Sequence, residues 1–178
     1  MIIHISGAPG SGKTTLGKKL IELKKRNVMI FDLDDIFDEF VSSHRFNSSS
    51  YQKFLNNLIK KHSNKHIIFV GLNMDKGHTS KLYNLHADYD IYIDIEEVIL
   101  LERLFYREVR QINRHKKMIW QDYLRDPNKI SLRLAHNVNI NALKKETKRF
   151  DKIYTKAAYQ WMTISAIKRL LRKLELII

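Results

Sequence analysis

A glycine-rich run near the start of the chain has the residue types and spacing of a phosphate-binding loop. Residues Gly7 to Thr14 read GAPGSGKT and fit the pattern G-x-x-x-x-G-K-[ST]. Glycines let backbone N–H groups converge on a phosphate without a Cβ clash, Lys13 can reach the β- and γ-phosphates, and Thr14 can place its hydroxyl on Mg²⁺. The run therefore predicts that the chain binds ATP with Mg²⁺. The predicted nucleotide contacts are Gly7, Gly10, Ser11, Gly12, Lys13, Thr14 and Thr15.

A group of aspartates follows the second apolar run. Asp32 stands directly after residues 28–31, VMIF, and Asp34 and Asp35 follow Leu33. In a doubly wound sheet, ligands bind at the carboxyl ends of the strands, and a carboxylate there can attract a cation or accept a hydroxyl proton. Asp34 is the candidate base for that hydroxyl proton, and Asp35 could replace it. The alternative interpretation is an acidic helix N-terminus that complements the helix dipole.

A series of arginines has helical spacing. Arg103 and Arg107 are one helical turn apart, and Arg110 and Arg114 continue the series. Guanidinium groups can stabilise the negative charge that spreads over a phosphoryl group in transfer. We predict a catalytic role for Arg107 and nucleotide contacts for Arg103 and Arg110. Glu108 offers a competing partner, so an exposed charged helix is the alternative.

Strands that alternate with helices must position these residues. Such alternation implies parallel strands joined by right-handed crossovers, and 178 residues suit one compact domain. The predicted strands are 2–6, 28–31, 67–70, 90–94 and 159–162. The predicted helices are 14–25, most of 36–63 with a break near 48–50, 96–112, 118–124, 142–156 and 165–176.

Charge and composition limit the partners. The net charge is +13, from 32 Lys and Arg against 19 Asp and Glu, which indicates either an anionic partner or a solvated lysine-rich surface. Trp120 and Tyr123 lie among basic residues, a pattern for nucleic-acid contact or for a local core. The absence of cysteine excludes disulfides and thiolate chemistry and suits the cytoplasm. No apolar stretch approaches the length of a membrane span, so no membrane partner is expected.

The motifs resemble those of P-loop kinases of small molecules and nucleotides. GAPGSGKTT is similar to the Walker A run of adenylate-kinase-type and shikimate-kinase-type enzymes, and the D-x-D run to that of shikimate and gluconate kinases. Residues 91–107 look like the fourth strand and next helix of nucleoside-monophosphate-kinase-like folds. The resemblance implies a three-layer α/β P-loop fold with five parallel strands in the order 2-3-1-4-5, and a lid around 107–133. It also implies that Asp32 joins Thr14 on the metal and that Asp34 faces the acceptor.

The expected activity is transfer of the γ-phosphoryl group of ATP to a small-molecule acceptor. The lid resemblance favours a nucleoside or nucleotide, whereas the D-x-D run favours a non-nucleotide hydroxyl. No acidic Walker B residue stands at the end of the third strand. Asn73 and Asp75 follow this strand and are either acceptor contacts or loop residues. A polynucleotide 5′-hydroxyl kinase and a non-catalytic nucleotide-dependent binding module are the alternatives. The oligomeric state stays open.

Overall fold

The protein is described by a computed structural model that covers residues 1–74, 81–128, 130–131, 134 and 138–178. Its contacts divide the chain into two compact units. The first, called the sheet unit, comprises Met1–Gly7, Gly12–Asp94 and Ile153–Ile178. The second, called the helical unit, comprises Ala8–Ser11 and Ile95–Lys152.

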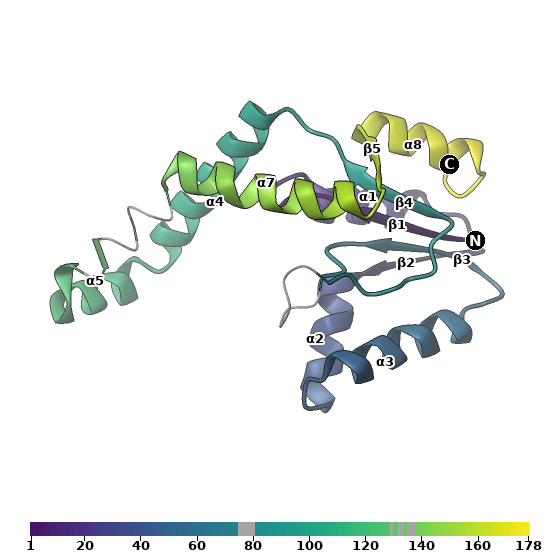
Figure 1. Cartoon of the computed structure of the whole chain (residues 1–178), viewed down its shortest axis with the longest axis horizontal. Coiled ribbons are helices and arrows are strands. Elements are labelled where there is room, and N and C mark those ends of the chain that lie inside the picture. The colour runs from purple at the N-terminus through teal and green to yellow at the C-terminus, as the bar shows by residue number, and fades with distance from the viewer. Residues whose placement is uncertain (75–80, 129, 132–133, 135–137) are drawn as a thin grey trace. The chain divides into compact units, whose positions relative to one another are not determined.

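A five-stranded parallel sheet forms the centre of the sheet unit (Figure 1). The strands are β1 (Ile2–Ser6), β2 (Val28–Asp32), β3 (His66–Val70), β4 (Tyr89–Ile93) and β5 (Gln160–Met162). Their order is β2-β3-β1-β4-β5, and every neighbouring pair is parallel. The strand order expected from the family resemblance is therefore confirmed. In this order β3 lies between the strand that leads to the phosphate loop and the strand that leads to the aspartates.

Helices cover both faces of the sheet (Figure 1). The helices α1 (Lys13–Leu23) and α8 (Ile164–Lys173) pack on one face, and α2 (Leu33–Ser43) and α3 (Ser48–Lys61) on the other. Along β3, Ile68 and Val70 join the first core while Ile67 and Phe69 join the second, as the two-residue repeat of a strand requires. Burying each such side chain contributes about 1.5–3 kcal/mol, so the two cores fix the sheet between its helices.

Three helices make up most of the helical unit: α4 (Glu97–Arg114), α5 (Lys116–Arg125) and α7 (Ile140–Lys156), whose last turn belongs to the sheet unit. Its core is small and gathers Ala8, Leu100, Leu101, Leu104 and Leu143. The three α4 leucines share one face because they are spaced at helical intervals. None of the residues of α5 is buried. Within the described ranges, no helix is both long enough and apolar enough to span a bilayer.

Side-chain caps explain where the helices after β2 begin. Asp32 accepts a hydrogen bond from the Asp34 N–H, so α2 starts at Leu33, earlier than its apolar pattern predicts. Asn47 accepts from the Ser50 N–H, and α3 therefore starts at Ser48. The break predicted near 48–50 lies at 44–47, directly before these serines, which begin α3.

Candidate nucleotide and acceptor site

The phosphate-binding motif lies in the turn from β1 to α1. Gly12 is the N-cap of α1 with φ 97°, and Gly10 has φ 85°, both in a left-handed region that disfavours residues with a Cβ. The first turn of α1 contains no acidic residue. The positive end of the helix dipole and the unpaired N–H groups of the first turn are therefore available to an anion. This local geometry fits a nucleotide phosphate.

Lys13 is the first residue of α1, and its side chain folds back over the start of the loop. Its Nζ donates to the Gly7 carbonyl oxygen at 2.7 Å. This contact holds the ammonium group beside the loop, where it can meet phosphate oxygens. Thr14 and Thr15 follow it in the first turn and are exposed, so their hydroxyls are accessible to a ligand.

The middle of the loop packs within the helical unit. A Cβ on Gly10 would lie 3.1 Å from Leu104 Cδ2, so a glycine fits here without displacing that side chain. The Ser11 N–H donates to the Ala8 carbonyl at 3.1 Å. The Ser11 hydroxyl is fully buried and has no hydrogen-bond partner among the described residues. Such an orphaned polar atom is a feature that a ligand at this loop would explain.

Asp32 is held by two parts of the fold at once. It pairs in register with Val70 on β3, and its Oδ1 accepts from the Asp34 N–H at 2.9 Å. Burial is the largest cause of a raised pKa for Asp32, and the charges of Asp34 and Asp35 raise it further, while the hydrogen bond from Asp34 N–H opposes them. The ionised form of the Asp32 carboxyl group is therefore disfavoured by its burial and by its acidic neighbours. A cation bound here would stabilise the ionised form.

Asp34 and Asp35 are exposed in the first turn of α2. Both therefore complement the α2 dipole, as the alternative interpretation expects, and both are also accessible to an acceptor. The end of β2 lies about 10 Å from the end of β1, since one strand separates them and strand spacing is about 4.8 Å. Lys13, Thr14, Asp32 and Asp34 thus stand along the carboxyl edge of one sheet, in one unit.

Gly71 brings the end of β3 against the start of α2. Its φ is 132°, and a Cβ there would lie 3.0 Å from Leu33 Cβ and 3.3 Å from the Leu33 backbone nitrogen. A larger residue would push apart the turn that contains the aspartates. No carboxylate follows β3 directly, because the chain continues as Gly71-Leu72-Asn73. The carboxylates at this part of the edge come from the β2–α2 turn.

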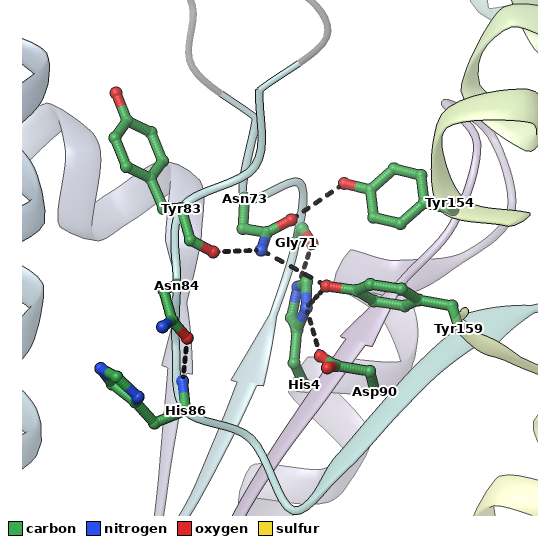
Figure 2. A network of polar contacts seen from close by, with 9 residues as sticks. All are labelled: His4, Gly71, Asn73, Tyr83, Asn84, His86, Asp90, Tyr154 and Tyr159. Carbon is green, nitrogen blue, oxygen red and sulfur yellow. Dashed lines mark hydrogen bonds and ion pairs between the residues drawn. The ribbon is translucent and has the colours of Figure 1, made fainter. Parts of the chain in front are cut away.

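Asn73 is buried at 4% exposure and is engaged through both amide atoms (Figure 2). Its Nδ2 donates to the Tyr83 carbonyl at 2.9 Å and to the Tyr159 hydroxyl at 3.3 Å. Its Oδ1 accepts from the Tyr154 hydroxyl at 3.2 Å. This placement favours the loop interpretation of Asn73 over an acceptor contact. Asp75 lies outside the described residues.

The predicted arginines lie in the helical unit, where α4 exposes Arg103, Arg107 and Arg110. Of these three, only Arg107 lines a pocket of about 400 Å³, and its Nη2 lies 3.2 Å from Glu108 Oε1. The pocket is also lined by Glu108, Ala142, Leu143, Lys145, Glu146 and Arg149.

The α7 cations of this pocket are absent from the predicted site. Lys145 and Arg149 are one turn apart on α7, and both line the pocket that Arg107 lines. Their four-residue spacing is the sequence signal that could have found them. Among the described residues, no group of three or more His, Asp or Glu side chains is arranged to hold a metal ion unaided.

No protein-family model matches the chain, and no curated protein matches it. Several solved structures are similar to it, including the following three. A shikimate kinase from Bacteroides thetaiotaomicron is 21% identical, with 99% of each chain covered and a TM-score of 0.45. A gluconokinase from Sinorhizobium meliloti 1021 is 16% identical over 59% of this chain and 63% of its own, with a TM-score of 0.34. The protein APE1195 is 15% identical over 70% of this chain and 71% of its own, with a TM-score of 0.36.

These similarities are similarities of fold. The chain's own strand order, together with the motif Gly7 to Thr14 between β1 and α1, identifies a three-layer α/β P-loop fold.

Proposed function

We propose that the chain transfers the γ-phosphoryl group of ATP to a hydroxyl group of a small-molecule acceptor. The observation that carries the proposal is the placement of Lys13 and Asp34 along one carboxyl edge of the sheet, within one unit. Lys13 provides a cation that can bind phosphate, and Asp34 provides an exposed carboxylate that can accept a hydroxyl proton. A nucleoside is the first acceptor to test, because it has the hydroxyl that Asp34 would serve. A nucleotide, whose phosphate needs no strong base, is the next.

Each residue has one task in this proposal. Lys13 neutralises charge on the β- and γ-phosphate oxygens, and the backbone N–H groups of the loop orient them. The oxygen of the acceptor hydroxyl bonds to the γ-phosphorus while the bond between that phosphorus and the ADP oxygen breaks. Asp34 takes the proton that the hydroxyl loses. Thr14 and Asp32 would hold Mg²⁺, which when bound offsets the phosphate charge.

Arg107 is the proposed partner of the transferring phosphoryl group. It has a neighbouring carboxylate in Glu108, so its charge is partly balanced in the described arrangement. Lys145 and Arg149 add positive charge to the same pocket. Because negative charge spreads over the phosphoryl oxygens during transfer, a guanidinium group that contacts these oxygens is most effective in the transition state.

A polynucleotide 5′-hydroxyl kinase is the second candidate, and the surface of α5 favours it. Trp120 is 59% exposed, and its ring stacks on Tyr123 at 5.6 Å between centroids. Exposed Lys116, Lys117 and Arg125 lie on the same helix. Exposed rings among cations suit stacking with bases and contact with phosphates. The same phosphoryl chemistry would then act on the 5′-hydroxyl at the end of a nucleic-acid strand.

Labelled ATP tests both candidates in one assay. The acceptors are nucleosides, nucleoside monophosphates, non-nucleotide polyols and hydroxy acids, and oligonucleotides with a free 5′-hydroxyl. Product with a small molecule supports the first candidate, and product with oligonucleotides alone supports the second. Calorimetric binding of ATP·Mg²⁺ without transfer to any acceptor would contradict both and identify a nucleotide-dependent binding module.

A further inference from the structure

A buried polar network joins β1 to the turn after β3 and to the segment before β5 (Figure 2). At its centre is His4, fully buried between Ile3 and Ile5 in β1. Its Nδ1 lies 2.7 Å from the Tyr159 hydroxyl, and its Nε2 lies 2.9 Å from the Gly71 carbonyl oxygen. A ring with two polar atoms is tolerated in this core because both atoms have partners.

The directions of the hydrogen bonds follow from the groups involved. A carbonyl can only accept, so His4 Nε2 carries a hydrogen and donates to Gly71. A neutral imidazole has one N–H, so Nδ1 accepts, and the Tyr159 hydroxyl donates to it. The Tyr159 oxygen in turn accepts from Asn73 Nδ2 at 3.3 Å. With these assignments, each of these polar atoms has a partner of the correct type.

Asp90 acts against this arrangement. Its Oδ1 lies 3.6 Å from His4 Nδ1, and its side chain is 39% exposed. A carboxylate attracts an N–H on Nδ1, whereas a hydroxyl that donates to Nδ1 requires a lone pair there. Burial, followed by the charge of Asp90 and a hydrogen bond with Asp90, raises the pKa of Tyr159, so the hydroxyl keeps its proton, for which Asp90 competes with His4 Nδ1. Tyr159 and Asp90 therefore favour opposite tautomers of His4, and only one of these has the Nε2–H that Gly71 accepts.

Gly71 connects the network to the candidate site. Its N–H donates to the Ile5 carbonyl at 3.0 Å, and its carbonyl accepts from His4, so β1 holds both of its polar groups. On its other side it lies against Leu33, close enough that an added Cβ would meet Leu33 Cβ at 3.0 Å. Leu33 begins α2 between Asp32 and Asp34. A change in the position of Gly71 is therefore passed to the two aspartates.

We propose that the Tyr159 hydroxyl is a positioning group for Asp32 and Asp34, acting through the His4 tautomer and the Gly71 carbonyl. Its effect on turnover rests on the proposed function, whereas its effect on His4 and Leu33 does not. Without the hydroxyl, the His4 proton moves from Nε2 to Nδ1, where it faces Asp90, and the Gly71 carbonyl oxygen loses its hydrogen-bond donor. The start of α2 then holds its carboxylates less well aligned with the loop that precedes α1.

Tyr154→Phe is the matched control for Tyr159→Phe. Both tyrosines are buried, and their rings are in edge contact at 4.8 Å. Each substitution removes one hydroxyl, but the Tyr154 hydroxyl contacts Asn73 on the side away from His4. A loss of packing would affect both variants, whereas loss of the His4 tautomer would affect only Tyr159→Phe.

The first measurement is ¹⁵N NMR of His4 at about pH 8, above the ordinary titration range of histidine. The parent and Tyr154→Phe are expected to have the Nε2–H tautomer, and Tyr159→Phe the Nδ1–H tautomer. The amide resonances of Leu33 and Asp34 should shift in Tyr159→Phe alone. Turnover in Tyr159→Phe should fall about tenfold, the lower range for outer-shell partners, with an unchanged KM for ATP.

Several results would overturn the proposal. An Nδ1–H tautomer or an imidazolium in the parent would show that Tyr159 is not the donor. An unchanged tautomer in Tyr159→Phe, or an equal loss of turnover in both variants, would do the same. If the parent transfers phosphoryl groups to no acceptor, the proposed function fails, and the NMR comparison still decides whether Tyr159 is linked to Leu33. The parent spectrum alone tests the tautomer if Tyr159→Phe does not fold.

Discussion

The aspartates after β2 and the arginines of α4 carry opposite charges in the proposed chemistry, and their surroundings differ. Asp32 is fixed by its bond to the Asp34 N–H at 2.9 Å, and Leu33 beside it is 2% exposed. Arg107 is 48% exposed, and its guanidinium pairs with Glu108, the next residue of the same helix. The Asp32 carboxylate is thus set by backbone and core, whereas the guanidinium is set by one partly exposed ion pair of small energy.

This difference separates two kinds of task. A group that holds a metal or aligns a hydroxyl must keep its distance constant, because small displacements cost large factors in rate. A group that meets charge only as it develops can be held weakly until then. We therefore expect Lys13 and Asp32 to act mainly on the binding of nucleotide and metal, and Asp34 and Arg107 to act on the rate of the assembled complex.

The largest effect is expected at Lys13. Lys13→Ala removes the cation beside the loop, which no neighbour replaces at that geometry, and should lower kcat/KM on the order of 10⁴-fold. Calorimetry should show weaker ATP binding as well. Lys19→Ala, an exposed lysine of the same helix, is the control. Unchanged ATP affinity in Lys13→Ala would contradict the phosphate-loop interpretation.

Asp34 should give the next largest effect. Asp34→Asn keeps the size of the side chain but cannot take a proton, so kcat should fall about 10²- to 10⁴-fold while ATP·Mg²⁺ affinity changes little. Asp38→Asn, an exposed aspartate one turn later on α2, is the control. A large loss in Asp35→Asn instead would move the base by one residue. No loss in either would favour a phosphate acceptor, which needs no strong base.

Substitution of Arg107 tests the role of the α4 arginines. Arg107→Ala should lower kcat about 10²-fold and weaken ATP binding much less, because its interaction strengthens in the transition state. Steady-state kinetics together with calorimetry separate the two quantities. Lys144→Ala is the control, since Lys144 lies in the same unit and pairs with Glu97 at 3.7 Å. If kcat stays at the parent value, Arg107 is a solvated charge on an exposed helix.

The smallest effect is expected for the thermal stability of the variant Asp32→Asn. The raised pKa means that the folded state holds this proton more tightly than the unfolded chain, so stability is lost as pH rises through the raised pKa. Asn cannot ionise and still caps a helix. Asp32→Asn should therefore raise Tm at neutral pH by about 1 °C, on a scale of about 2–4 °C per kcal/mol.

Two further readings sharpen the Asp32 prediction. The gain in Tm should vanish at about pH 3, where aspartate is protonated in both states. The Mg²⁺ concentration needed for turnover should rise in the same variant. A lower Tm at neutral pH would show that the ionised carboxylate stabilises the fold, and would remove the argument that this site favours a cation.

The sequence by itself determined the features whose causes lie within a few neighbouring residues. The phosphate loop is one, since its glycines, Lys13 and Thr14 act through local backbone geometry and a helix start. The strands and most helices are others, because their apolar spacing reflects which faces are buried. The strand order came from resemblance to known motifs, and the sheet confirms it.

Only the tertiary structure decided which distant residues meet. His4 and Tyr159 are 155 positions apart, and Asn73 and Tyr154 are 81 apart, so no local pattern relates them. The placement of β3 between β1 and β2 brings Gly71 against Leu33, and a small helical core brings Arg107 to the same pocket as Arg149. A polar side chain in a strand is unfavourable alone and becomes acceptable only when folding supplies its partners, which is why His4 could be understood only in three dimensions.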